Sequence, residues 1–316
     1  MAWIIIFFLS FHSSVFAWGF FAHKKINQIA IVHLPANLRV FYKSYSQQIV
    51  KGATSPDSRR MVVPGEDVRH FIDVEAYLDR GFSIQELPKN WPGALELLGQ
   101  DFLEKHGISP WNLIRVYRQL VYAFEQKSLP AILRLSADLG HYIADMCVPL
   151  HNTRNYNGQL THQEGIHRFW ETDIPEAFFE EYNLWSGDIY YIESISRFAF
   201  EVVEETYPLA QLVLDQERAL KNTFPPTELY RLVYRSGKLS TSYSLGFSKK
   251  YQESIDDLVQ KQMKKSIFYL ASLWYSAWID AAQPDLRQWN RLIPAELAEL
   301  YEKKPPKAKL YYRRED

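Results

Sequence analysis

Imidazole and carboxylate side chains are concentrated in one short stretch of the sequence. His141 and Asp145 are four residues apart, His167 and Glu171 repeat that spacing, and His151 lies between the two pairs. Residues four apart share one face of a helix, so each pair can reach a single cation. Together the five candidate ligands span 31 residues. Their mixture of nitrogen and oxygen donors is typical of zinc at a hydrolytic site rather than at a structural cysteine site.

Either pair alone has a simpler explanation, because a His/carboxylate pair at this spacing is often a surface ion pair of small value. The neighbours of His141 favour burial instead, since Leu135, Leu139 and Ile143 surround it in the sequence. A buried ionisable group needs a partner, and a metal ion is one.

More candidate ligands lie upstream. Asp57 falls in the expected loop TSPDSRR, and His70 begins an apolar stretch in VRHFID. If the chain is cleaved before Trp18, the new α-amine has a pKa of about 7.7–8.0 and becomes a neutral nitrogen ligand at little cost. With its own carbonyl oxygen that amine closes a five-membered chelate, and His23 follows shortly after.

Helices must position these donors. Apolar residues recur at helical spacing in several segments, whereas the strict alternation of strands is hard to find. The expected helices cover residues 111–125, 129–144, 192–205, 210–221 and 254–281, with long loops at about 52–70, 80–95 and 150–166. Pro149 and Pro175 are expected where helices stop. We therefore predict an all-α fold, with a single multi-helix domain over residues 18–290.

The two ends of the chain differ from this domain. Residues 3–9 are apolar but too short to span a bilayer, and Val15-Phe16-Ala17 fits the small-residue rule for cleavage of a signal peptide. We expect residues 1–17 to be a signal peptide that directs export to the periplasm or out of the cell; a buried N-terminal strand or helix is the alternative. No later stretch is apolar enough for a membrane helix. Residues 291–316 are expected to form a basic, disordered tail.

Charge and cysteine content exclude some classes of protein. Lys+Arg 36 and Asp+Glu 37 give a formal net charge of −1, which argues against binding nucleic acid mainly by bulk electrostatics. The single cysteine, Cys147, excludes a disulfide within this sequence and is expected to be buried as a small hydrophobe. Of the remaining histidines, His33 and His106 are expected at the surface and His162 in a loop or behind the ligands.

Taken in order, these residues resemble a known superfamily. The pattern Trp-x4-His, Asp, His-Phe-x-Asp, His-x3-Asp-x3-Pro-x-His and His-x3-Glu is similar to that of bacterial zinc-dependent phospholipase C and of the single-strand-specific zinc nucleases of fungi and plants. The resemblance extends from Trp18 to about Asp285. It implies a single all-α domain with a trinuclear zinc cleft that holds three Zn²⁺ ions.

The resemblance also implies a ligand set for each ion. The first zinc would take Asp57, His70, His141 and Asp145. The second would take the amine and carbonyl of Trp18, with His23 and a bridging Asp145. The third would take His151, His167 and Glu171. The implied mechanism is in-line attack on phosphorus by a hydroxide that bridges two zinc ions, with Asp57 orienting or deprotonating the attacking water.

The substrate is less closely defined. Glu171 and the lack of disulfides favour the phospholipase branch, whereas Arg60, three residues after Asp57, suits an anionic substrate. Phe71 and Asp73 correspond to nuclease residues that stack on and hydrogen-bond a base, although the phospholipases have similar residues there. We predict a phospholipase C-type hydrolase of phospholipids or other phosphate esters. The alternatives are a single-strand-specific nuclease or 3′-nucleotidase, acting on single-stranded nucleic acid or nucleotides, and a non-catalytic helical protein that binds lipid or a partner.

Overall fold

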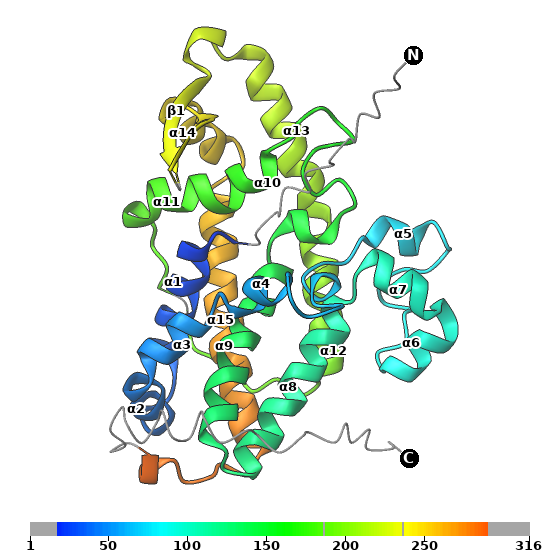
Figure 1. Ribbon diagram of the computed structural model, residues 1–316, viewed down its shortest axis with the longest axis vertical. Helices are drawn as coiled ribbons and strands as arrows, with labels where there is room; N and C mark the ends of the chain where they lie inside the picture. The colour runs from blue at the N-terminus through cyan, green and yellow to red at the C-terminus, as the bar shows by residue number, and fades with distance from the viewer. Residues whose placement is uncertain (1–17, 186, 236, 290–316) are drawn as a thin grey trace, which may run out of the picture.

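Long helices form the body of the protein in the computed structural model, which describes residues 18–185, 187–235 and 237–289 (Figure 1). About 67% of the chain is helical, and a two-stranded hairpin is the one sheet among the described residues. The all-α prediction is therefore confirmed. The expected signal peptide 1–17 and tail 291–316 lie outside the described residues, and the domain limits 18–290 stay a prediction.

Most of the helical elements are joined by short connections, and longer ones follow α5, η3 and η5. The first half of the chain contains α1 (Phe20–Ala30), η1 (Ile31–His33), α2 (Ala36–Ser44), α3 (Ser46–Gly52), α4 (Ser55–Arg59), η2 (Asp67–Arg69), α5 (Val74–Leu78), α6 (Trp91–Leu98), α7 (Gln100–His106), α8 (Ser109–Glu125), α9 (Leu129–Met146) and η3 (Pro149–Asn152). The second half contains α10 (Ile166–Arg168), the π-helical turn η4 (Phe169–Asp173), α11 (Ile174–Phe178), η5 (Phe179–Glu181), α12 (Ile195–Thr206), α13 (Pro208–Thr223), η6 (Pro226–Glu228), β1 (Tyr230–Arg235), β2 (Lys238–Tyr243), α14 (Leu245–Ser254), α15 (Leu258–Asp280) and η7 (Arg287–Trp289).

Helix α9 is the centre of the molecule. It packs against α1, α3, α8 and α15, and nearly all of its residues are buried. A helix that is apolar on most sides is stable only when neighbours cover it all round, as they do here. In Figure 1, α8, α9 and α15 run along the long axis, whereas α5, α6 and α7 project to the right.

Aromatic side chains join the core helices. The Tyr42 ring of α2 stacks on Trp274 of α15, with 4.5 Å between ring centroids. Both side chains also reach α9, since the Tyr42 hydroxyl lies 2.8 Å from Ser136 Oγ and Trp274 Nε1 donates to the Ser136 carbonyl at 3.1 Å. Large aromatic residues therefore bury much apolar area while their polar atoms keep partners.

The sequence pattern locates most long helices within a few residues. The predicted helices at 111–125, 129–144, 192–205 and 210–221 correspond to α8, α9, α12 and α13. The predicted helix 254–281 is α15, which begins at Leu258 after α14 has ended.

Three local expectations were wrong. Asp57 lies in the short helix α4 rather than in a loop, and α6 begins inside the predicted loop 80–95. Pro175 does not end a helix but occupies the first turn of α11, where the missing N–H of proline costs nothing. The hairpin β1–β2 was not predicted, because its alternation of residues is short.

No helix among the described residues combines the length and the apolar character that crossing a membrane requires.

Gly140 sets the distance between α1 and α9. A Cβ atom at this position would lie 2.4 Å from Asn27 Oδ1, and Asn27 is itself fully buried. Asn27 Nδ2 donates to the His23 carbonyl at 3.1 Å, so the same contact supports a candidate ligand.

We expect Gly140→Ala to lower the free energy of unfolding by about 1–3 kcal/mol, because overpacking here outweighs the better helix propensity of alanine. Denaturant titration measures the effect. The control is Gly246→Ala in α14, where the nearest atom to a new Cβ lies 3.9 Å away. Equal stability of the two variants would contradict the proposed close packing.

Candidate metal centre

Three groups of buried histidines and carboxylates have their donor atoms close enough together to hold a metal ion. The groups are His23, His141 and Asp145; Asp57, His70 and His141; and His151, His167 and Glu171. The structure thus brings together all eight side chains that the resemblance implied as ligands, from segments far apart in the sequence.

Asp145 joins the first two groups. Its Oδ1 lies 3.3 Å from His23 Nε2, whereas its Oδ2 lies 2.8 Å from His70 Nδ1 and 3.3 Å from His141 Nε2. The two oxygens of one carboxylate therefore face different histidines, which is the arrangement that a carboxylate bridging two ions requires. The His23 and His141 rings stack, with 4.0 Å between centroids.

Asp57 completes the side of the centre formed by His70. Asp57 Oδ1 lies 3.7 Å from His141 Nε2 and 3.9 Å from His70 Nδ1. Arg60 Nη1 lies 3.9 Å from the same oxygen, and the Arg60 side chain keeps 23% of its surface exposed. A cation thus stands at the edge of the centre, where a substrate anion can meet it.

The third group lies on the segment that includes η4. His167 Nε2 is 2.9 Å and His151 Nε2 is 3.5 Å from Glu171 Oε2, and the two Nε2 atoms are 3.1 Å apart. His167 belongs to α10 and Glu171 to the π-helical turn that follows it. Such turns often occur at functional sites, since they alter the direction of side chains within a helix.

Backbone carbonyls orient three of the histidine rings. The Nδ1 atoms of His141, His151 and His167 lie 2.8, 2.7 and 3.0 Å from the carbonyl oxygens of Ala53, His70 and Tyr156. Each ring therefore keeps Nδ1 protonated as a donor and turns Nε2 towards its group. A histidine that binds metal usually has this kind of outer partner.

Several buried donor atoms of these groups make no hydrogen bond among the described residues, although some lie within ion-pair distance of one another. They are both nitrogens of His23, both oxygens of Asp57, both oxygens of Glu171, Nε2 of His70 and Oδ1 of Asp145. Buried polar atoms without hydrogen bonds are costly, whereas a divalent cation would satisfy these atoms together. The donor set therefore fits a metal, and its nitrogen and oxygen atoms suit zinc.

Ionisation of the metal-free groups reflects burial and crowding. Burial raises the pKa of Glu171 to about 8 and that of Asp57 to about 6. Burial lowers the pKa of His23 to about 3 and that of His70 to about 4. Burial also acts to lower the pKa of His141, but the charges of Asp145 and Asp57 outweigh it and raise that pKa to about 9.

Trp18 lies beside this centre. Its Nε1 donates to the Ala144 carbonyl at 2.7 Å, its ring packs 5.0 Å from that of Trp170, and the next residue, Gly19, donates its N–H to the Glu171 carbonyl at 3.0 Å. The start of α1 is therefore held between the helix of Asp145 and the turn of Glu171.

The predicted substrate residues lead away from the metal groups towards a pocket. Phe71 and Asp73 follow His70, and Ile72 between them donates its N–H to the His151 carbonyl at 2.9 Å. Asp73 Oδ2 lies 3.2 Å from His106 Nδ1, and His106 lines the pocket. His106 was expected only as a surface residue; nothing in its local sequence identified Asp73 as its partner.

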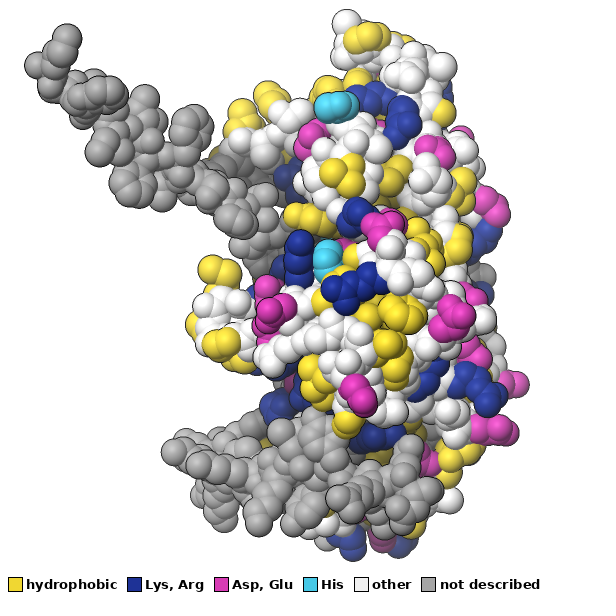
Figure 2. Space-filling model, turned by 90° about the vertical axis from the view of Figure 1, so that its right-hand side faces the viewer, with side chains coloured by type: hydrophobic (Ala, Val, Ile, Leu, Met, Phe, Trp, Pro, Cys, Tyr) yellow, Lys and Arg dark blue, Asp and Glu magenta, His cyan; other side chains and the backbone are white. Residues whose placement is uncertain are grey.

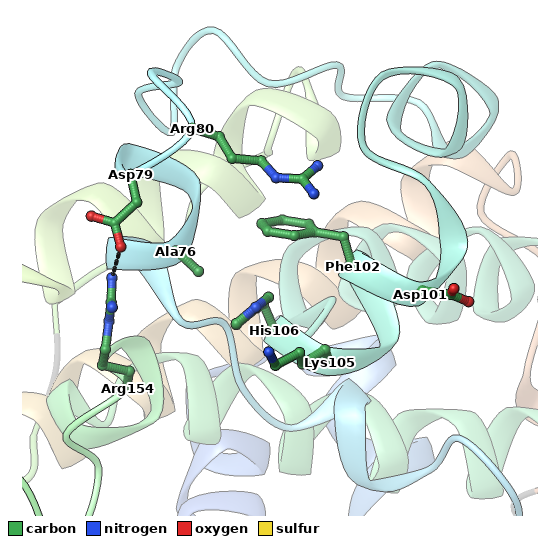
Figure 3. A pocket seen from close by; sticks show the side chains of 8 residues that line it. All are labelled: Ala76, Asp79, Arg80, Asp101, Phe102, Lys105, His106 and Arg154. Atoms are coloured by element: carbon green, nitrogen blue, oxygen red, sulfur yellow. Dashed lines mark hydrogen bonds and ion pairs between the residues drawn. The ribbon is translucent and has the colours of Figure 1, made fainter.

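This pocket has a volume of about 450 Å³ and carries basic side chains from the turn after α5, from α7 and from the loop after His151 (Figure 3). Arg80 lies over the Phe102 ring at 3.8 Å, and Arg154 forms an ion pair with Asp79. Seen from the side on which α5–α7 project, basic, acidic and hydrophobic side chains are interspersed (Figure 2). None of the residues of the three metal groups lines this pocket, which is linked to the His70 segment by the contact between His106 and Asp73.

The two remaining expectations concern residues near the ligands. Cys147 is fully buried, as predicted, and burial raises the pKa of its thiol to about 11, so it behaves as a small hydrophobe. His162 is exposed in a turn and adopts a φ of 59°, away from all three groups.

Comparison with known proteins gives a similar solved structure. No family model matches the chain, and no curated protein matches it. Among solved structures, a crystal structure of alpha-toxin from an avian strain of Clostridium perfringens matches with 13% sequence identity and a TM-score of 0.46. The match covers 84% of this chain and 65% of the toxin, so the chain spans less than two thirds of that protein's length. The conclusions about the site rest on the geometry described above.

We expect Asp145→Asn to lower the metal content of the purified protein by one ion or more per chain and to lower its melting temperature, because the amide cannot bridge two ions as a carboxylate does. Mass spectrometry measures the metal. The control is Asp138→Asn, also buried on α9, whose carboxylate pairs with Arg59 at 3.1 Å. Loss of metal from both variants alike would contradict the bridging role of Asp145.

Metal uptake at pH 7 should release protons. Glu171 and His141, with pKa values of about 8 and 9, hold protons in the metal-free chain, and metal ions must displace them. The affinity should therefore rise as the pH rises from 6 towards 8. Calorimetry in buffers of different ionisation enthalpy counts the protons, and Glu171→Gln should release about one fewer. Uptake without proton release would refute this ionisation scheme.

Proposed function

We propose that this protein is a zinc-dependent hydrolase of phosphoric esters, most closely of the phospholipase C type. The observation that carries the proposal is the position of Asp145, whose two oxygens face separate histidines and so couple two candidate metal groups. The third group is tied to them, since His151 Nδ1 donates to the His70 carbonyl. Phosphoryl chemistry commonly uses such adjacent ions.

The donor set supports a hydrolytic rather than a structural role. The described groups contain imidazole and carboxylate donors and no thiolate, and their eight side chains, with His141 common to two groups, are few enough to leave positions for water and substrate. When bound, the ions would lower the pKa of water and offset negative charge on the phosphate oxygens.

Two residues of the chain have roles beside the ions. Asp57, whose Oδ1 lies within 4 Å of both His141 and His70, would orient the attacking water or accept a proton from it. Arg60, which lies beside Asp57 and is partly exposed, can donate to a phosphate oxygen and orient the ester. Asp57 belongs to the group that shares His141 with the His23 group, and Arg60 lies beside Asp57.

One observation favours the second candidate function, a nuclease or 3′-nucleotidase. Asp73 contacts His106 at the wall of a pocket that carries Arg80 and Arg154, and Phe71 precedes Asp73 in the same segment. A nucleotide combines a base with phosphate charge, so basic groups beside a carboxylate and a ring suit it.

Export is part of the proposal. Cleavage before Trp18 would free the α-amine of Trp18. The Trp18 ring donates to the Ala144 carbonyl and Gly19 donates to the Glu171 carbonyl, so the new terminus would lie beside the candidate metal centre. The amine would serve there as a nitrogen ligand. N-terminal sequencing of the secreted protein should therefore begin at Trp18. A mature chain that begins at Met1 or Ala2 would remove this ligand from the proposal.

The activity is tested by parallel assays of the zinc-loaded protein on phosphatidylcholine, an anionic phospholipid, single-stranded DNA and 3′-nucleotides. We expect close to three zinc ions per chain and turnover of a phospholipid. Hydrolysis of DNA or 3′-nucleotides alone would select the second candidate, and a protein that binds no metal would be a non-catalytic binding protein.

Asp57→Asn should lower turnover by a factor of about 10²–10⁴ while lowering the zinc content far less, because a positioned acid or base contributes about that much. The control is Asp67→Asn, an exposed carboxylate in η2 outside the three groups. Unchanged turnover of Asp57→Asn would contradict its role towards water.

A further inference from the structure

The hairpin β1–β2 exposes an apolar face. Cross-strand partners of an antiparallel pair point to the same side of the sheet. The partners on one side are Tyr230 with Tyr243, Leu232 with Thr241, and Tyr234 with Leu239. Leu232, Tyr234 and Leu239 keep 68%, 75% and 63% of their surface exposed. We call these three residues and Tyr230 the hairpin face.

One end of the hairpin packs on the protein. Ser242 is buried, and its Oγ donates to Asp173 Oδ2 at 2.5 Å. Arg168 Nη2 donates to the Thr241 carbonyl at 3.0 Å. The three most exposed residues of the hairpin face stay in solvent, although apolar residues of an antiparallel sheet normally lie on its buried side. Packing among the described residues therefore does not explain the apolar character of the hairpin face.

A stack of aromatic rings ties the hairpin face to the candidate metal centre. Tyr230 stacks on Tyr243 with 5.2 Å between centroids, and Tyr243 stacks on Phe247 at 4.3 Å. Tyr243 also packs against Phe169 at 4.6 Å, and Phe169 belongs to η4, the turn that carries Glu171. In Figure 1 the hairpin lies near α11 and α14, at one end of the molecule. The hairpin face is therefore held in a fixed position relative to the third metal group.

The charge of this segment points to an anionic partner. Residues 230–252 contain no Asp or Glu and five basic residues, which are Arg231, Arg235, Lys238, Lys249 and Lys250. The whole chain has a net charge of −1, so this segment is a local excess of positive charge. Tyrosine and leucine side chains next to basic residues are typical of elements that lie in the interface of a bilayer with anionic lipids.

We propose that the hairpin face is a docking surface for an anionic lipid bilayer, into whose interface Leu232, Tyr234 and Leu239 insert. This goes beyond the proposed hydrolysis, because binding to the surface requires neither metal nor turnover. If the hydrolase proposal is also correct, the bound lipid surface lies at a fixed orientation to the third metal group.

A fluorescent label tests the proposal directly. The chain's single cysteine is buried, so a thiol introduced by Thr241→Cys, at an exposed position on the side of the hairpin face, can be labelled selectively with an environment-sensitive dye. Stopped-flow mixing with phosphatidylcholine vesicles that contain phosphatidylglycerol should shift the dye emission to the blue within seconds, before lipid is consumed. The same dye at Ser44→Cys, exposed at the end of α2, should not respond. A response at both positions, or at neither, would overturn the proposal.

Co-sedimentation of the full chain with the same vesicles gives an independent readout. The triple variant Leu232→Ser, Tyr234→Ser, Leu239→Ser should reduce the vesicle partition coefficient by about tenfold or more, because three inserted side chains are lost. The matched control carries Val32→Ser, Val40→Ser and Leu97→Ser, three apolar residues that are 49%, 51% and 43% exposed on other elements. Wild-type partition of the hairpin variant would overturn the proposal. A wild-type chain that binds no vesicles but forms a concentration-dependent dimer, which the hairpin variant does not form, would also overturn it. The hairpin face would then bind a second copy of the chain.

Discussion

Asp145 carries its carboxylate at a fully buried position, and histidines from three separate parts of the chain surround it. A negative charge in a medium of low polarity must be matched by positive charge close by. Burial acts to raise the pKa of Asp145, yet the charges of His141 and His151 hold it well below its usual range. The carboxylates of Asp57 and Glu171 respond in the opposite way, and the pKa of each is raised by burial. Ionised and protonated groups gathered in one small volume are typical of residues that bind metal ions.

The fold serves this arrangement by bringing backbone as well as side chains to it. Three of the histidine rings are turned by carbonyl groups of Ala53, His70 and Tyr156, which lie in three different connections between helices. The segment from His70 to Asp73 contains a candidate ligand, a carbonyl that orients His151 and a carboxylate that contacts His106 at the pocket. Helix α1 approaches α9 at Gly140 closely enough for His23 to stack on His141. Changes in packing between α1 and α9 are therefore expected to shift the side chains of the candidate ligands.

Two surface features are linked to the candidate metal centre through different contacts. The pocket lined by residues of α5, α7 and Arg154 is linked to the His70 segment by the contact between His106 and Asp73. The hairpin face is linked to η4 by stacked aromatic rings. The first feature carries charged side chains of both signs, whereas the most exposed residues of the second are apolar.

Local patterns in the sequence were enough to predict the long helices and to single out the candidate ligands. Apolar spacing located α8, α9, α12 and α13, and the i, i+4 pairs His141/Asp145 and His167/Glu171 are visible in the sequence because their spacing is local. How these pairs combine depends on the tertiary structure: Asp145 faces two sets of histidines, His106 contacts Asp73 33 positions away, and apolar residues of β1–β2 are exposed. These relations depend on contacts between segments far apart in the chain, and no local pattern encodes which distant segment a side chain will meet. The physical reason is that propensity and periodicity act over a few residues, whereas burial is settled only when the whole core packs.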